Sequence, residues 1–128
     1  FPYTTLFRSD FVIESGTSGV WTYRKWKSGV GECFCHYSFD TTIDTEWGVL
    51  FESPAVELPR FPFVFMEEPQ IHISMSNSDY AAFIERGSQS GRATLAKPGS
   101  VYLVRPKAAT SSASYKVAIY AIGKTDVS

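Results

Sequence analysis

The segment VWTYRKWKSGVGECFCHYSF, residues 20–39, decides the fold class of this chain. In residues 20–26 the side chains alternate with a period of two, which places Trp21 and Tyr23 on one face. In residues 30–39 the two cysteines, a tyrosine and a phenylalanine share a face in the same way. A period of two is typical of a β-strand. The short Ser-Gly turn between the two stretches predicts that they pair as an antiparallel hairpin.

The rest of the chain consists of short apolar stretches separated by turn residues. Alternation predicts further strands, in residues 47–52, 71–76, 80–86, 101–105 and 115–122. Two stretches rich in polar or small residues are expected to be loops, residues 40–46 and 108–114. Prolines confine the pieces around them to strand edges, bulges or strand starts, at positions 54, 59 and 62. The pattern predicts an all-β domain, an antiparallel β-sandwich or small barrel of about seven to eight short strands.

Composition sets limits on the class of protein. With 128 residues and 44% apolar composition, the chain is expected to form one domain with a core of its own. The net charge of -1 is spread without blocks, which argues against a nucleic-acid partner. No apolar stretch reaches the roughly 18 to 20 residues needed to cross a bilayer, so no membrane insertion is expected. Cys33 and Cys35 would lie about 6.5 to 7 Å apart in a strand, too far for a disulfide, so free thiols are expected.

The first nine residues, FPYTTLFRS, resemble the translation of a sequencing-adapter oligonucleotide. We therefore interpret residues 1–9 as a non-native segment and residues 10–128 as a single β domain. The expected origin is a metagenomic read, and the domain is expected to be the C-terminal part of a longer protein. The alternative is a natural N-terminal strand built from Phe1, Tyr3 and Phe7.

Residues 14–33, ESGTSGVWTYRKWKSGVGEC, carry a resemblance to a known class of proteins. They are similar to a signature of bacteriophage tail-fibre and minor tail proteins, which reads G-T-S-G-x-W-x-Y-R-K-W-x-S-G-x-x-E-C-W-G. Phe34 and Cys35 stand here in place of the final Trp-Gly, and the resemblance continues more loosely to residues 118–124. It implies a virion protein, assembled in the cytoplasm of the bacterial host, that forms a homotrimer at the tip of a tail fibre and attaches to the host surface.

Candidate ligand-binding residues lie in or beside predicted loops and turns, because loops carry binding functions more often than strands do. They could contact a bacterial surface glycan or teichoic acid through ring faces and hydrogen bonds, and they are Trp47, Asn77, Asp79, Tyr80, Arg86 and Gln89. The alternative interpretation is that these are ordinary solvated loop residues.

A subunit interface is the second expectation, because 16% aromatic residues exceed what a small sandwich ordinarily buries alone. The candidates are the aromatic residues of the first strand, Trp21, Tyr23 and Trp26. The alternative is that these side chains fill the core of a single chain.

Neither a metal, a cofactor nor catalysis is expected. Strand alternation sends His36 to the face opposite Cys33 and Cys35, and no further pair of ligands completes a zinc site. No nucleophile, metalloprotease or phosphate-binding motif is present. Three hypotheses follow: an adhesive fibre tip, a structural trimerisation or capping module without a ligand, and a glycan-cleaving tail enzyme. The last would need two carboxylates about 5 to 9 Å apart in a cleft.

Overall fold

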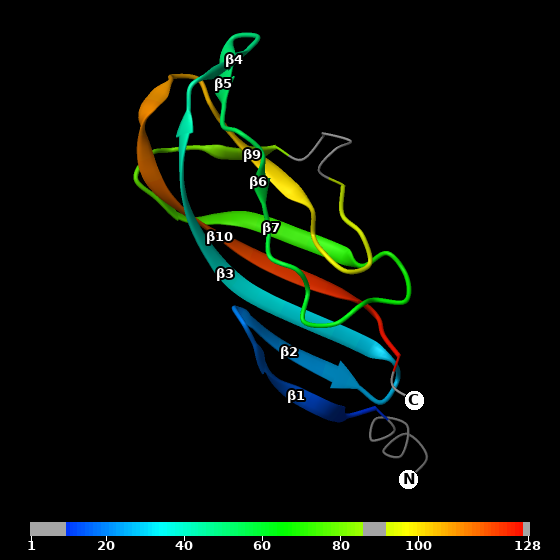
Figure 1. Ribbon diagram of the computed structural model, residues 1–128. Helices are drawn as coiled ribbons and strands as arrows, with labels where there is room; N and C mark the ends of the chain where they lie inside the picture. The colour runs from blue at the N-terminus through cyan, green and yellow to red at the C-terminus, as the bar shows by residue number, and fades with distance from the viewer. Residues whose placement is uncertain (1–9, 86–91, 127–128) are drawn as a thin grey trace.

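The computed structural model describes residues 10–85 and 92–126, and this part of the chain forms ten β-strands and no helix (Figure 1). The strands are β1 Val12–Ser18, β2 Trp21–Trp26, β3 Val30–Ile43, β4 Thr45–Trp47, β5 Leu50–Glu52, β6 Val56–Glu57, β7 Gln70–Ser78, β8 Phe83–Glu85, β9 Ser100–Arg105 and β10 Ala109–Lys124. They form two antiparallel sheets, so the predicted all-β sandwich class is confirmed. The segment interpreted as non-native, residues 1–9, lies outside the described residues.

The larger sheet has five strands in the order β1-β2-β3-β10-β7. The predicted hairpin is confirmed, because β2 and β3 pair with Thr22 opposite Phe34. The two longest strands, β3 and β10, lie side by side along the length of the domain (Figure 1). Strand β7 pairs with the other side of β10, and this places segments far apart in the sequence on one continuous surface.

The smaller sheet has the order β4-β5-β9-β6, and β8 also pairs with β9. It crosses in front of the larger sheet in Figure 1. Strands β5 and β6 pair with opposite ends of β9 because Pro54, which has no N–H, interrupts them. Ser53 spans the break: its N–H donates to the Leu103 carbonyl at 2.8 Å, and its Oγ accepts from the Leu103 N–H at 2.9 Å.

Two loop predictions are wrong. Strand β3 continues through residues 40–43, and β10 begins at Ala109, inside the stretch expected to be a loop. The Ile43 side chain is fully buried, and Ile43 pairs with Ala109. Burial of this one β-branched side chain explains why β3 and β10 both continue through stretches that are otherwise polar. Strand β1 was not predicted, and it adds to the edge of β2 with Glu14 opposite Lys25.

The core lies between the two sheets. Inward side chains of β3 and β10, including Cys33, Val117 and Ile119, pack in one buried cluster with Val101 of β9. A second cluster toward the β4–β5 end contains Ile43, Leu103, Ala109, Ala113 and Tyr115. Burial of these alternate positions leaves the intervening side chains of the larger sheet on its outer face.

A strandless segment between β6 and β7 closes one end of the core with aromatic side chains. The Phe65 ring contacts those of Phe61 and Phe63 edge-on, with centroid distances of 5.1 and 4.9 Å. Two glycines that pair with each other across β3 and β10, Gly31 and Gly123, leave room for this cluster against the sheet. A Cβ atom on Gly31 would clash with the Thr125 methyl carbon and lie 3.1 Å from the Phe63 ring, and one on Gly123 would lie 3.0 Å from the Phe65 ring. Glycine is therefore needed for this close approach.

Both cysteines are free thiols, as predicted, and both are buried. Burial raises the pKa of Cys33 to about 12 and that of Cys35 to about 11. At neutral pH both groups are neutral, so they pack as small apolar side chains.

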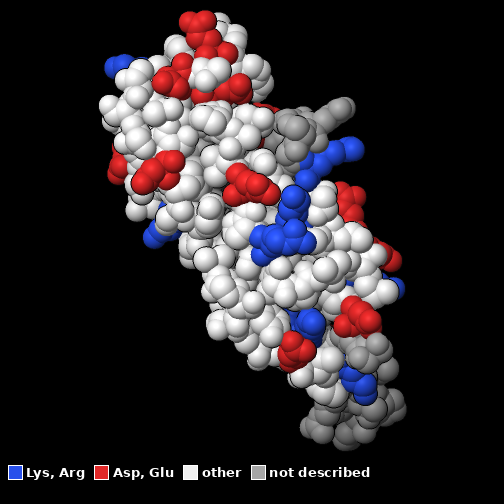
Figure 2. All heavy atoms as spheres, viewed as in Figure 1, with Lys and Arg blue, Asp and Glu red and all other residues white. Residues whose placement is uncertain are grey.

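Charged side chains of both signs are interspersed over most of the face seen in Figure 2. Acidic side chains gather at the end of the domain that carries the β4–β5 hairpin, where Glu46 and Glu52 lie. In residues 10–85 and 92–126, no helix is long and apolar enough to cross a membrane.

Candidate functional site

A groove runs over β10 on the outer face of the larger sheet, between β3 and β7. It has a volume of about 650 Å³ and is open to solvent. Six residues whose side chains alternate outward from the three strands line it: Phe34 and His36 of β3, Ala118 and Tyr120 of β10, and His72 and Ser74 of β7. We call this site the outer groove.

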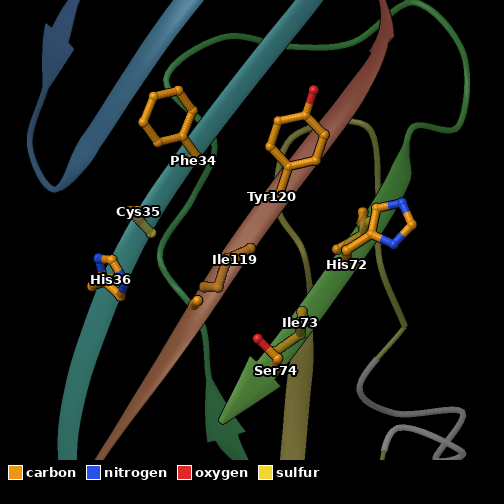
Figure 3. Close-up of a pocket in the computed structure, with 10 residues that line it drawn as sticks. Phe34, Cys35, His36, His72, Ile73, Ser74, Ile119 and Tyr120 are labelled. Carbon is orange, nitrogen blue, oxygen red and sulfur yellow. The ribbon is translucent and has the colours of Figure 1, made fainter. Parts of the chain in front are cut away.

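Strand register explains the shape of the outer groove. One row across the sheet contains Phe34, Tyr120 and His72, which are cross-strand partners (Figure 3). The next row contains His36, Ala118 and Ser74. Ala118 has the smallest side chain of the two rows and lies in the middle strand. The face is therefore hollow at its centre and bordered by larger rings.

The ring surfaces of the groove are accessible. Phe34 is 38% exposed, although it occupies a strand position where a polar residue is the usual choice. The Tyr120 ring is half-buried, and its centroid lies 6.2 Å from that of the His72 ring at an interplanar angle of 40°. The Arg24 guanidinium lies 5.9 Å from the Phe34 centroid. Apolar ring faces and polar side chains thus alternate within one open surface.

A buried carboxylate holds one border of the groove in place. Glu32 is 7% exposed; it accepts a hydrogen bond of 2.5 Å from the Tyr120 hydroxyl and pairs with Arg24 Nε at 2.8 Å. The hydrogen bond to Glu32, together with burial, raises the pKa of Tyr120 to about 12. The phenol is therefore a neutral donor whose ring orientation is fixed toward Glu32.

The groove offers several groups that can make non-covalent contacts with a ligand. His36 and His72 supply ring nitrogens, Ser74 supplies a hydroxyl, and the rings supply flat apolar surface. Of the described residues that line the groove, none is Asp or Glu. Within the same described ranges, no three or more His, Cys, Asp or Glu side chains are grouped so that they could hold a metal ion.

The residues predicted to bind a ligand lie elsewhere. Trp47 lies at the tip of the β4–β5 hairpin and is 47% exposed. Asn77 and Tyr80 are exposed at and just beyond the end of β7, whereas Asp79 links to β10 through its carboxylate, which accepts from the Ser114 N–H at 2.9 Å. None of these described residues lines the outer groove. The remaining two predicted residues, Arg86 and Gln89, lie outside the described residues.

The three residues predicted at a subunit interface differ in exposure. Trp21 is 2% exposed, and its ring lies 5.6 Å from that of Phe61 in the core, so it cannot supply a contact between subunits. This part of the prediction needs correction, because β2 turns Trp21 toward the second sheet. Tyr23 is half-buried and donates to Glu14 at 3.0 Å. Trp26 is half-buried opposite Val12 at the edge of the larger sheet.

Sequence reasoning missed the outer groove, although one signal was present. Alternation placed Phe34 and His36 on the outer face of the hairpin, and an aromatic residue there marks an apolar surface facing solvent. The pairing of β7 with β10, which adds His72 and Ser74, has no local signal. Comparison with protein-family models, curated proteins and solved structures finds no match for this chain.

Proposed function

We propose that this chain is a non-enzymatic adhesive module of a bacteriophage tail fibre, which binds a bacterial surface glycan in the outer groove. The observation that carries the proposal is the combination of the exposed Phe34 ring and the half-buried Tyr120 ring with hydrogen-bonding side chains in one open groove. Ring faces pack against the C–H faces of pyranose sugars, and the neighbouring polar groups can bond to hydroxyls. The groove volume of 650 Å³ lies within the range of about 300 to 1,000 Å³ of ligand sites.

Binding is favoured over cleavage because the chemistry of glycoside hydrolysis requires two carboxylates on either side of the bond. Glu32 lies beneath the border of the groove, but it is buried and already bound to Arg24 and Tyr120. A carboxylate held in this way orients a ring and does not supply a free acid or nucleophile. The resemblance of residues 14–33 to tail-fibre proteins supports the attachment role.

Replacing Phe34 with Ala is expected to weaken the affinity for neutral cell-wall oligosaccharides by about tenfold or more, because an aromatic contact at the groove is lost. Isothermal titration calorimetry with β-linked hexose and N-acetylhexosamine oligomers measures this change. Trp47→Ala is the matched control, because Trp47 is also exposed but lies outside the groove. Loss of affinity in Trp47→Ala with none in Phe34→Ala would move the binding site to the hairpin tip.

Trimer formation, which the resemblance of residues 14–33 implies, is a second candidate role, and the edge strand β1 favours association between copies. Val12 and Ile13 of this edge strand are 37% and 45% exposed, and Phe11, which precedes it, is 48% exposed. An exposed apolar edge is a template for association with another copy.

We expect light scattering to give a mass near three times 14.3 kDa, and a Val12→Lys, Ile13→Lys variant to give monomers. Val49→Lys, on the exposed hairpin, should leave the mass unchanged. A monomeric wild-type protein at high concentration would reject this role.

A further inference from the structure

A second hollow lies where β9 passes into β10, and we propose that it is a binding site for a phosphate group. This end cavity has a volume of about 270 Å³, and its polar lining consists of Tyr80, Arg105, Lys107, Thr110 and Ser111. None of these residues lines the outer groove. The proposal therefore stands independently of glycan binding in that groove.

The charge of the end cavity fits an anion. Arg105 and Lys107 are both cations, and in the described part of the chain no Asp or Glu lines the cavity. The hydroxyls of Thr110 and Ser111 add neutral hydrogen-bond donors. A phosphate has several acceptor oxygens in a tetrahedral arrangement and can use the guanidinium, the ammonium and the hydroxyls together. A planar carboxylate would use fewer of them.

The Arg105 side chain is held in position, but its Nε atom lacks a hydrogen bond to the described residues. Its guanidinium carbon lies 4.7 Å from the Tyr80 ring centroid, a stacking contact that fixes the planar group. Its Nε atom is buried and has no hydrogen-bond partner in the described structure. A buried N–H without a partner is destabilising, and an anion oxygen bound at the guanidinium would supply a partner.

The neighbouring carboxylate is engaged with β10. Asp79 precedes Tyr80; its Oδ2 accepts from the Ser114 N–H at 2.9 Å, and its own N–H donates to the Ser114 carbonyl at 3.1 Å. These two hydrogen bonds fix the turn that carries Tyr80 against β10. The Asp79 side chain therefore positions one wall of the end cavity and is not part of its lining.

A β-bulge forms the opposite wall. Ala109 pairs with Ile43 and Ala113 pairs with Thr41, so β10 advances by four residues (113 − 109) while β3 advances by two (43 − 41). Such a bulge removes backbone groups from the ladder and redirects side chains. Thr110 and Ser111 lie within it and line the cavity. Backbone N–H groups released from the ladder would add donors for an anion.

The test is a titration of the full, ¹⁵N-labelled chain with inorganic phosphate at low ionic strength, followed by amide chemical shifts. We expect saturable shifts at the amides of Thr110 and Ser111. Arg105→Gln and Lys107→Gln should each weaken binding by about tenfold or more, since each removes a charge-assisted hydrogen bond. Lys107 is exposed, so its variant remains informative even if Arg105→Gln does not fold.

Lys124→Gln is the matched control, because it removes the same charge at the opposite end of β10. It should retain wild-type phosphate affinity, and the Arg105→Gln variant should retain its affinity for neutral oligosaccharides. Tighter binding of poly(glycerol phosphate) than of inorganic phosphate would assign the site to a surface polymer, and equal affinity would assign it to free phosphate. Absence of saturable shifts, equal weakening by Lys124→Gln, or acetate binding as tight as phosphate would overturn the proposal.

Discussion

Replacing Phe65 with Ala is expected to lower the free energy of unfolding by about 3 to 5 kcal/mol, the usual cost of truncating a buried aromatic side chain. Phe65 is 1% exposed and contacts the rings of both Phe61 and Phe63. It lies in a strandless segment, which isolated backbone hydrogen bonds attach to its neighbours: the Phe65 N–H donates to the Leu95 carbonyl at 2.9 Å, and the Met66 N–H donates to the Lys124 carbonyl at 2.8 Å. Domains of this kind have a total stability of about 5 to 15 kcal/mol, so the variant is expected to be close to unfolding at physiological temperature.

Urea denaturation of the Phe65→Ala variant measures this effect, and Val64→Ala is its control. Val64 is the preceding residue but is 62% exposed, so its truncation should change stability by no more than about 0.5 kcal/mol. A loss below about 1 kcal/mol for Phe65→Ala would show that the aromatic cluster does not close the core. Equal losses in the two variants would lead to the same conclusion.

Raising the pH above 9 is expected to destabilise the fold steadily. The thiols of the unfolded chain ionise near their ordinary pKa of 9.0, whereas burial keeps Cys33 and Cys35 protonated in the folded protein until about 12 and about 11. The folded state then binds more protons than the unfolded state, so the free energy of unfolding falls as pH rises through this window. Tyr120 acts in the same direction between 10.0 and about 12, mainly because of its hydrogen bond to Glu32.

The free energy of unfolding is measured from about pH 8 to about pH 11 under reducing conditions, for wild type and for a Cys33→Ala, Cys35→Ala double variant. The comparison separates the contribution of the two thiols from that of the Tyr120 phenol. The double variant starts from a lower stability because two buried side chains are shortened. Its stability should nevertheless decline less steeply with pH than that of wild type. Parallel declines would mean that the thiols are not shielded in the folded state.

Local patterning was sufficient to predict the fold class and part of the strand set. In residues 20–39 the period-two alternation predicted the hairpin, and the structure has it, although the outward Phe34 departs from the usual apolar-in, polar-out pattern. The same reasoning failed near Ile43, where a single buried residue extends β3 through a polar stretch. Patterning also did not predict that the Ser53 hydroxyl accepts a hydrogen bond from the Leu103 N–H, in place of a backbone carbonyl. This bond depends on where Leu103 lies in the folded chain.

The outer groove could be predicted only in part. Phe34 and His36 were placed on the outer face by alternation, but Tyr120 and His72 join them through pairings between distant segments. Two tryptophans also differ in burial, which the sequence did not indicate: Trp21 lies in the core, whereas Trp47 is exposed at a hairpin tip. Residue type alone did not distinguish these two tryptophans, since either is compatible with a core or a binding surface.

Chemical-shift mapping of the wild-type chain decides whether the outer groove binds glycan. The protein would be titrated with neutral oligosaccharides released from bacterial cell walls while its amide resonances are followed. If glycan binds in the outer groove, we expect saturable shifts centred on the amides of Phe34, His36, Ala118 and Tyr120. Shifts confined to the hairpin around Trp47, or no saturable shift with any of the oligosaccharides, would contradict this proposal.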